Sequence, residues 1–307
     1  MTLLKLIRFP NLIIVVLTQY LLQYCILVPA LTKAELTPTL PYFPFSLLVL
    51  STVLIASGGY IINDIEDWQI DAINKPNKQI VGKSMTIASA YIYYAAFGIL
   101  GLLISLYLAF YIHDLLQLLI YPTAVALLWA YSKYFKKTIL IGNFIVSIFC
   151  AFVAGVIWYA ERDNFRILRA KAPTEAGLVS QIFTNYLIFA FLTTLFREII
   201  KDIEDTEGDK LNGCKTLPIV SGVKTAKTIA LGVALIFLLF IAHLTIQETY
   251  ANRYLQLFIF STTISAPALY AIYTLTKAKT KQEYKNLSAL AKVIMLSGLI
   301  YILFINL

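Results

Sequence analysis

An acidic segment that occurs twice is the part of this sequence best suited to chemistry. Ile61–Asp71 and Ile199–Asp209 share seven of eleven aligned residues, and each follows a long apolar run. Their aspartates recur at the same intervals: Asp64, Asp67 and Asp71 in the first segment, and Asp202, Asp205 and Asp209 in the second. At about 100° per residue, this spacing predicts that each set of three carboxylates lies on one face of a helix, within an arc of about 60°.

Carboxylates crowded on one helix face repel one another unless a cation lies among them. Neither segment contains His or Cys, so the available ligands are oxygens, which favour magnesium or calcium over zinc or copper. Magnesium commonly shares one or two protein carboxylates with substrate phosphates. We therefore predict that all six aspartates act as magnesium ligands, in two clusters that face each other and grip a diphosphate.

Basic side chains beside the clusters are candidates for neutralising phosphate oxygens: Lys75, Lys78, Lys83, Arg197 and Lys201. The alternative is a set of interfacial ion pairs in which Arg197, Lys201 and Lys210 contact Glu198, Asp202 and Glu207. The duplication of the acidic segment favours the functional interpretation. Arg8, just before Phe9-Pro10-Asn11, either begins the first helix at the membrane surface or touches substrate, and we expect the former.

The composition, with 59% apolar and 14% charged residues among 307, indicates a polytopic membrane protein. Runs of about 20 residues are long enough to span a bilayer. Nine are expected: Asn11–Leu31, Phe45–Ile62, Ala88–Ile112, Leu115–Tyr131, Thr138–Tyr159, Ile182–Ile200, Thr228–Ile246, Leu255–Thr276 and Leu290–Phe304. No soluble domain interrupts them, so we expect one all-α domain over residues 1–307. Asp64 and Asp202, 138 residues apart, indicate two pseudo-equivalent halves.

The Lys and Arg residues divide 19 to 6 between the two faces that nine spans define. The positive-inside rule then predicts that the N-terminus and both acidic segments face the cytoplasm from the cell inner membrane. The net charge of +8 belongs to this face and is explained by topology and by attraction to anionic membrane lipids. Because the basic residues are dispersed over separate loops, we expect no binding of nucleic acid.

The acidic segments and the residues after them resemble the UbiA superfamily of intramembrane prenyltransferases. Asn63-Asp64-x-x-Asp67-x-x-x-Asp71, followed by Asn74-Lys75-Pro76-Asn77-Lys78 and Gly82-Lys83, is similar to its first motif, and Asp202-x-x-Asp205-x-x-x-Asp209 to its second. Two further stretches are similar to the branch that comprises the geranylgeranylglycerol-phosphate geranylgeranyltransferases of ether-lipid synthesis. They are Arg197–Asp209 with Lys215-Thr216-Leu217-Pro218-Ile219, and Tyr131-Ser132-x-x-Phe135-Lys136 with Gly142-Asn143.

The resemblance implies nine transmembrane helices around a central cavity, with both acidic motifs at its cytoplasmic mouth. Magnesium at Asp64, Asp67, Asp202 and Asp205, the catalytic residues, would assist departure of diphosphate from a prenyl diphosphate donor. Asp71 and Asp209 would hold metal-bound waters or basic side chains. The remaining expected substrate contacts are Asn63, Lys83, Tyr131, Lys136, Arg197 and Lys201. A dry cavity would protect the allylic cation from water.

The expected activity is magnesium-dependent transfer of a prenyl group to a lipid-soluble acceptor. The favoured prenyl group is geranylgeranyl, and the favoured acceptor is geranylgeranylglycerol phosphate. An aromatic acceptor from quinone-type biosynthesis remains an alternative, because the motifs alone discriminate acceptors poorly. A membrane transporter that uses the acidic pairs as a cation site is a third interpretation. It is disfavoured because the carboxylates belong to one interface, whereas transporter sites usually lie near the bilayer midplane.

Overall fold

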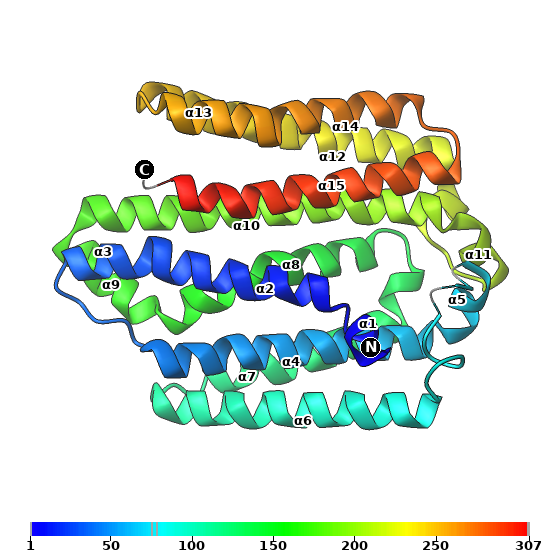
Figure 1. Cartoon of the computed structure of the whole chain (residues 1–307), viewed down its shortest axis with the longest axis horizontal. Helices are drawn as coiled ribbons and strands as arrows, with labels where there is room; N and C mark the ends of the chain where they lie inside the picture. The colour runs from blue at the N-terminus through cyan, green and yellow to red at the C-terminus, as the bar shows by residue number, and fades with distance from the viewer. Residues whose placement is uncertain (1, 75, 78, 306–307) are drawn as a thin grey trace. The chain divides into compact units, whose positions relative to one another are not determined.

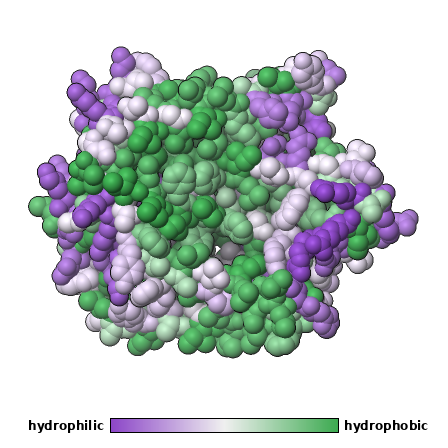
Figure 2. Space-filling view, turned by 180° about the vertical axis from the view of Figure 1, so that it is seen from behind, coloured by the Kyte–Doolittle hydropathy of each residue, from purple (hydrophilic) through white to green (hydrophobic). Residues whose placement is uncertain are grey.

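The computed structural model describes residues 2–74, 76–77 and 79–305, and helices make up nearly all of them (Figure 1). Within these residues, eight helical segments are long and apolar enough to cross a membrane: Phe9–Lys33, Tyr42–Glu66, Ile87–Tyr111, Ile141–Ala160, Pro173–Glu204, Leu217–Tyr250, Tyr254–Lys277 and Lys281–Phe304. The prediction of an all-α integral membrane protein is therefore confirmed. Figure 2 shows wide hydrophobic areas on the face that it draws, as contact with lipid requires.

The exact count of nine spans stays a prediction, because the segment expected at Leu115–Tyr131 forms α7 (Gln117–Lys133), a helix of 17 residues with Pro122 inside it. Seventeen residues rise about 26 Å, which is at the short limit for a bilayer core of about 30 Å. A charged residue flanks each end of α7 and forms an ion pair there. Asp114, three residues before the helix, pairs with Arg162 at 2.7 Å, and Lys136, three residues after it, pairs with Asp67.

The helices form two compact units. Unit 1 comprises Met1–Lys136 and Val153–Phe183. It contains α1 (Thr2–Leu6), α2 (Phe9–Leu21), α3 (Val28–Lys33), α4 (Tyr42–Glu66), α5 (Trp68–Asn74), α6 (Ile87–Tyr111), α7 and α9 (Arg162–Lys171). Within it α4 packs against α6 and α7, as the lower part of Figure 1 shows.

Unit 2 comprises Lys137–Phe152 and Thr184–Leu307. It contains α11 (Thr206–Leu211), α12 (Leu217–Tyr250), α13 (Tyr254–Phe260), α14 (Ala266–Lys277) and α15 (Lys281–Tyr301). The helices α8 (Ile141–Ala160) and α10 (Pro173–Glu204) pass from one unit into the other. The core of unit 2 joins apolar residues of α10, α12, α14 and α15, among them Ile199, Ala230 and Leu275.

Two membrane helices contain a wide helical turn just before a proline. The turn η1 (Leu22–Leu27) lies between α2 and α3, and η3 (Ser261–Ser265) lies between α13 and α14. Pro29 and Pro267 follow them closely. Proline lacks an N–H, and its ring clashes with the carbonyl four residues earlier, so a locally wider turn keeps the helix continuous.

The polar stretch Ala160–Gln181, which lies between the expected spans Thr138–Tyr159 and Ile182–Ile200, is also largely helical. It forms α9 and the first turns of α10, which begins at Pro173. Proline suits the first turn of a helix, because an N–H there would have no partner within the helix. Hydropathy therefore located the spans but not the full lengths of the helices.

At the end of unit 1 where α4 begins, one buried carboxylate accepts several hydrogen bonds. Glu161 is 1% exposed and accepts hydrogen bonds from the backbone of Thr39 at 2.9 Å and of Leu40 at 3.1 Å. The side chains of Asn164 and Gln23 donate to it as well, at 2.8 and 3.4 Å. Four N–H groups thus replace the water that a buried carboxylate loses, and they fasten the loop between α3 and α4 to α9.

Candidate active site

The first acidic segment contains a break in the helix at its middle aspartate. Helix α4 ends at Glu66, Asp67 has backbone angles of φ −98° and ψ 2°, and α5 begins at Trp68. The Asp67 N–H still donates to the Asn63 carbonyl at 3.0 Å, and the Asp71 N–H donates to the Asp67 carbonyl at 2.8 Å. The prediction of one continuous helix face was therefore wrong, because Asp64 and Asp71 stand on different helices.

The second acidic segment repeats this break. Helix α10 ends at Glu204, Asp205 has φ −93° and ψ 3°, and α11 begins at Thr206. The Asp205 N–H donates to the Lys201 carbonyl at 2.9 Å, and the Asp209 N–H donates to the Asp205 carbonyl at 3.1 Å. The duplication read in the sequence therefore extends to the backbone at the middle aspartate.

Arg8 neutralises the first aspartate. Its Nη2 lies 2.8 Å from Asp64 Oδ1, and its guanidinium carbon lies 4.8 Å from the centre of the Tyr60 ring. Burial lowers the pKa of Arg8, but the charge of Asp64 raises it, and the net pKa is above its ordinary value. Arg8 therefore stays charged. As expected, Arg8 begins the first long helix: it directly precedes α2, with φ 52°.

Lys136 lies among the oxygens of the first cluster. Its Nζ is 2.6 Å from Asp67 Oδ1 and also donates to Asn63, at 3.3 Å to Oδ1 and 3.5 Å to the carbonyl oxygen. Lys136 belongs to the short turn η2 (Phe135–Lys137) between α7 and α8. The structure therefore brings together four residues that the sequence predicted for the site, namely Asn63, Asp64, Asp67 and Lys136, and adds Arg8.

Three other residues of unit 1 were predicted for the site: Asp71, Tyr131 and Lys83. Asp71 is half-buried on α5, and Tyr131 is half-buried on α7, where it interacts electrostatically with Arg8. Lys83 is exposed and donates to the Pro76 carbonyl at 3.0 Å, so it stabilises its own loop. The predicted contacts Lys75 and Lys78 lie outside the described residues.

In unit 2, Asp202 is held by an amide. Asn143 Nδ2, on α8, donates to Asp202 Oδ2, on α10, at 2.9 Å. The pattern Gly142-Asn143 was noted in the sequence, but nothing in its spacing indicated this contact, because 59 residues separate the two partners.

Glu198 forms ion pairs with the two residues of unit 2 that were predicted to contact phosphate. Arg197 Nη1 donates to Glu198 Oε1, and Lys201 Nζ lies 3.6 Å from Glu198 Oε2. Arg197 Nε is buried and has no hydrogen-bond partner among the described residues, so one donor of the guanidinium is available for a further acceptor. The ion pair of Arg197 with Glu198 agrees with the interpretation as interfacial ion pairs, but Lys201 pairs with Glu198 instead of Asp202.

The donor atoms of the first cluster suit a hard cation. Within residues 2–74, 76–77 and 79–305, no three His, Cys, Asp or Glu side chains converge on a ready metal site. The Lys136 ammonium group nevertheless lies against three oxygens of Asp67 and Asn63, and carboxylate and carbonyl oxygens are the ligands that magnesium prefers. The residues present therefore fit a magnesium ion, and the Lys136 ammonium group lies against the oxygens that would bind it.

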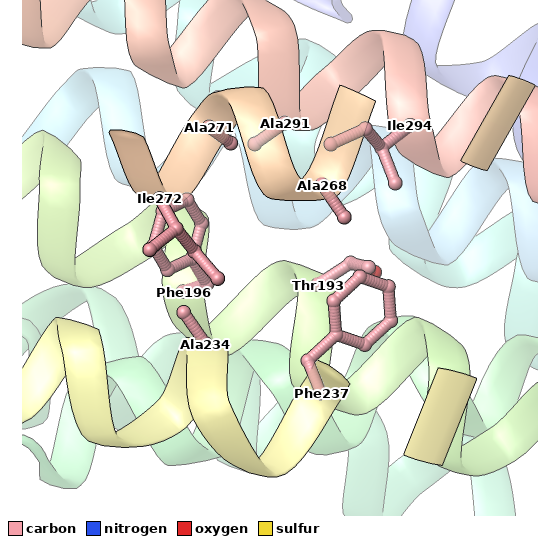
Figure 3. A pocket seen from close by; sticks show the side chains of 9 residues that line it. All are labelled: Thr193, Phe196, Ala234, Phe237, Ala268, Ala271, Ile272, Ala291 and Ile294. Carbon is pink, nitrogen blue, oxygen red and sulfur yellow. The ribbon is translucent and has the colours of Figure 1, made fainter. Parts of the chain in front are cut away.

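Unit 2 also contains an apolar pocket. Four alanines and two phenylalanines account for most of its wall, as Figure 3 shows. The lining residues come from α10, α12, α14 and α15: Thr193, Phe196, Ala234, Phe237, Ala268, Ala271, Ile272, Ala291 and Ile294. The Thr193 hydroxyl is turned to its own helix, where it donates to the Phe189 carbonyl at 2.7 Å. None of the predicted site residues that the structure describes lines this pocket.

Known structures share the fold. A digeranylgeranylglyceryl phosphate synthase has a TM-score of 0.62 at 23% identity, over 99% of this chain and 98% of the other. A UbiA homologue from Archaeoglobus fulgidus, bound to DMAPP and Mg²⁺, has a TM-score of 0.54 at 18% identity, over 99% of this chain and all of the other (100%).

Curated relatives are more similar in sequence. The digeranylgeranylglyceryl phosphate synthase of Saccharolobus solfataricus is 35% identical over 248 residues, which are 78% of this chain and 79% of that protein. The synthase of Sulfolobus acidocaldarius is also 35% identical, over 62% of this chain and 61% of its own length. The sequence pattern of the UbiA prenyltransferase family matches residues 24–296. This chain therefore belongs to the UbiA prenyltransferase family.

Proposed function

We propose that this chain transfers a geranylgeranyl group from its diphosphate to the free hydroxyl of geranylgeranylglyceryl phosphate, and so makes an ether lipid. The observation that carries the proposal is the acidic segment, duplicated in sequence and in its helix break, in a chain 35% identical to a protein named for this synthesis. The hydrophobic spans suit a reaction in which both prenyl chains are lipid-soluble.

We assign magnesium binding to Asp64, Asp67 and Asp71 in unit 1 and to Asp202, Asp205 and Asp209 in unit 2. When bound, magnesium neutralises the charge that develops on the departing diphosphate. Asn63, Lys136 and Tyr131 of unit 1, with Lys83 in a supporting loop, and Arg197 and Lys201 of unit 2 complete the proposed donor site. The available Nε of Arg197 supports its assignment, because a phosphate oxygen would satisfy that buried donor.

The reaction exchanges one bond to oxygen for another. The bond between C1 of the prenyl chain and the diphosphate oxygen breaks, and both electrons leave with the diphosphate. A bond forms between C1 and the hydroxyl oxygen of the acceptor, and the hydroxyl proton is released. This step requires a site that excludes water, because water would otherwise capture the allylic cation and give a prenyl alcohol.

The proposal includes a place in the cell. We assign both acidic segments to the cytoplasmic face of the plasma membrane, and the support is the division of Lys and Arg residues, 19 to 6. We also propose that the whole chain acts as one prenyltransferase domain.

Purified protein with magnesium and geranylgeranyl diphosphate tests the acceptor. Geranylgeranylglyceryl phosphate and an aromatic acid would be offered separately at equal donor concentration, and the products separated by mass. We expect digeranylgeranylglyceryl phosphate from the first reaction and only unreacted acid from the second. A prenylated aromatic product without diether lipid would keep the family assignment and refute the proposed acceptor.

A further inference from the structure

Lys136 contacts the first acidic cluster in the way that a bound cation would. The side chains of Lys136 and Asp67 are only 10% and 16% exposed, so water screens their charges weakly. The ammonium group lies closest to Asp67 Oδ1, at 2.6 Å, and is also within reach of both oxygens of Asn63. These oxygens belong to the residues that the proposed function assigns to magnesium and phosphate.

Lys136 and magnesium compete for the same oxygen. Magnesium binds oxygen at about 2.0–2.1 Å. If it shared Asp67 Oδ1 with Lys136, the two cations would be no more than about 4.7 Å apart, with weak screening between them. Magnesium at Asp67 Oδ1 therefore requires the ammonium group to move away.

The two cations of the first cluster differ in their freedom to move. Arg8 is fixed by its ion pair with Asp64, by the Tyr60 ring, and by a backbone in the left-handed region at φ 52°. Lys136 has a flexible stem of four carbons and lies in the three-residue turn η2 between two helices. Exchange for a metal ion is therefore much easier at Lys136 than at Arg8.

We propose that Lys136 is an exchangeable counter-ion: it occupies the Asp67–Asn63 oxygens before magnesium binds, and it moves to the diphosphate when magnesium takes its place. This inference rests on the proposed function, since it requires that the first cluster binds magnesium. It adds an order of events to that function. Metal binding releases the cation that then contacts the donor phosphate.

Amine footprinting of the wild-type protein tests the exchange without measuring catalysis. The protein in detergent would be acetylated briefly with a chelator present, with magnesium chloride, and with magnesium plus inorganic pyrophosphate, and each lysine quantified by mass spectrometry. We expect magnesium alone to raise the reactivity of Lys136 several-fold, and pyrophosphate to lower it again. Lys133 is the internal control, because it lies in the last turn of α7 over the rings of Trp129 and Tyr134, outside the cluster.

Matched variants test the competition by calorimetry. Lys136→Met and Lys133→Met each remove one positive charge near the same loop. We expect Lys136→Met to bind magnesium about tenfold more tightly, or about 1.4 kcal/mol, while Lys133→Met binds it as the wild type does. If Lys136→Met does not fold, the footprint of the wild type decides the question.

The outcomes separate the two proposals. Magnesium binding that leaves the reactivity of Lys136 unchanged would overturn the exchange and spare the proposed function. The absence of any magnesium binding to the wild-type protein would overturn both.

Discussion

Asn143 Nδ2 donates a hydrogen bond of 2.9 Å to Asp202 Oδ2, and this contact fixes the orientation of the first aspartate in the second acidic segment. Loss of a group that orients a metal ligand commonly costs about 10- to 100-fold in affinity or activity. We therefore expect Asn143→Ala to lower kcat/KM by about that factor and to raise the magnesium concentration needed for half-maximal activity.

Ser147→Ala is the matched control for Asn143→Ala. Ser147 lies one turn further along α8, is buried, and donates only to the Asn143 carbonyl of its own helix. Its variant should keep the magnesium dependence of the wild type. Equal effects from both variants would mean that Asn143 acts only through the packing of α8.

Asp64→Asn and Asp202→Asn should each slow turnover strongly while leaving a measurable rate. Both substitutions keep the shape of the side chain but remove a charge assigned to metal binding. Removal of one group from a preorganised charge-stabilising site commonly costs about 2.7 to 4 kcal/mol, or roughly 100- to 1,000-fold in rate. Product formation measured at saturating magnesium checks this, and Asp163→Asn, on the exposed face of α9, is the control.

The double variant tests whether the two acidic segments serve the same chemical step. Residues that act as a unit give strongly non-additive losses. We expect Asp64→Asn with Asp202→Asn to be about as slow as the slower single variant. Losses that multiply would contradict a shared role in departure of the diphosphate.

Gly298→Ala should destabilise unit 2. A Cβ at this position would lie 2.2 Å from Phe189 Cε1, so the ring or the helix would have to move. Overpacking of this kind typically costs about 1–3 kcal/mol. Gly232→Ala is the matched control, because no atom outside its own helix lies within 4 Å of the added carbon. Thermal unfolding in detergent should show a lower midpoint only for Gly298→Ala, and equal midpoints would contradict the packing.

Labelling with a membrane-impermeant thiol reagent should establish the orientation. Asn77 lies in the exposed loop after the first acidic segment, and Arg169 is exposed on α9. After Cys25, Cys150 and Cys214 are replaced, we expect a cysteine at position 77 to react only from the cytoplasm and one at position 169 only from outside. The opposite pattern would place the acidic segments on the other side of the membrane.

The sequence predicted the fold class and the prenyltransferase family well, because both depend on local patterns. Long apolar runs located the eight long helices, and the repeated aspartates identified the residues that Lys136 and Arg8 contact. The helix breaks at Asp67 and Asp205 could not be predicted, since the residues around them permit a continuous helix. The contact of Asn143 with Asp202 was also inaccessible, because pairing between distant residues leaves no periodic signal in one chain.

The position of Glu161 in the chain determines when the loop between α3 and α4 can be fastened during synthesis. The amides of Thr39 and Leu40, in the loop between the first two long helices, have their acceptor more than 120 residues downstream. By the time Glu161 leaves the ribosome, α6, α7 and α8 have already been made. The loop therefore stays unfastened while the nascent chain inserts these helices, and the hairpin of the first two long helices becomes locked only after Glu161 has been translated.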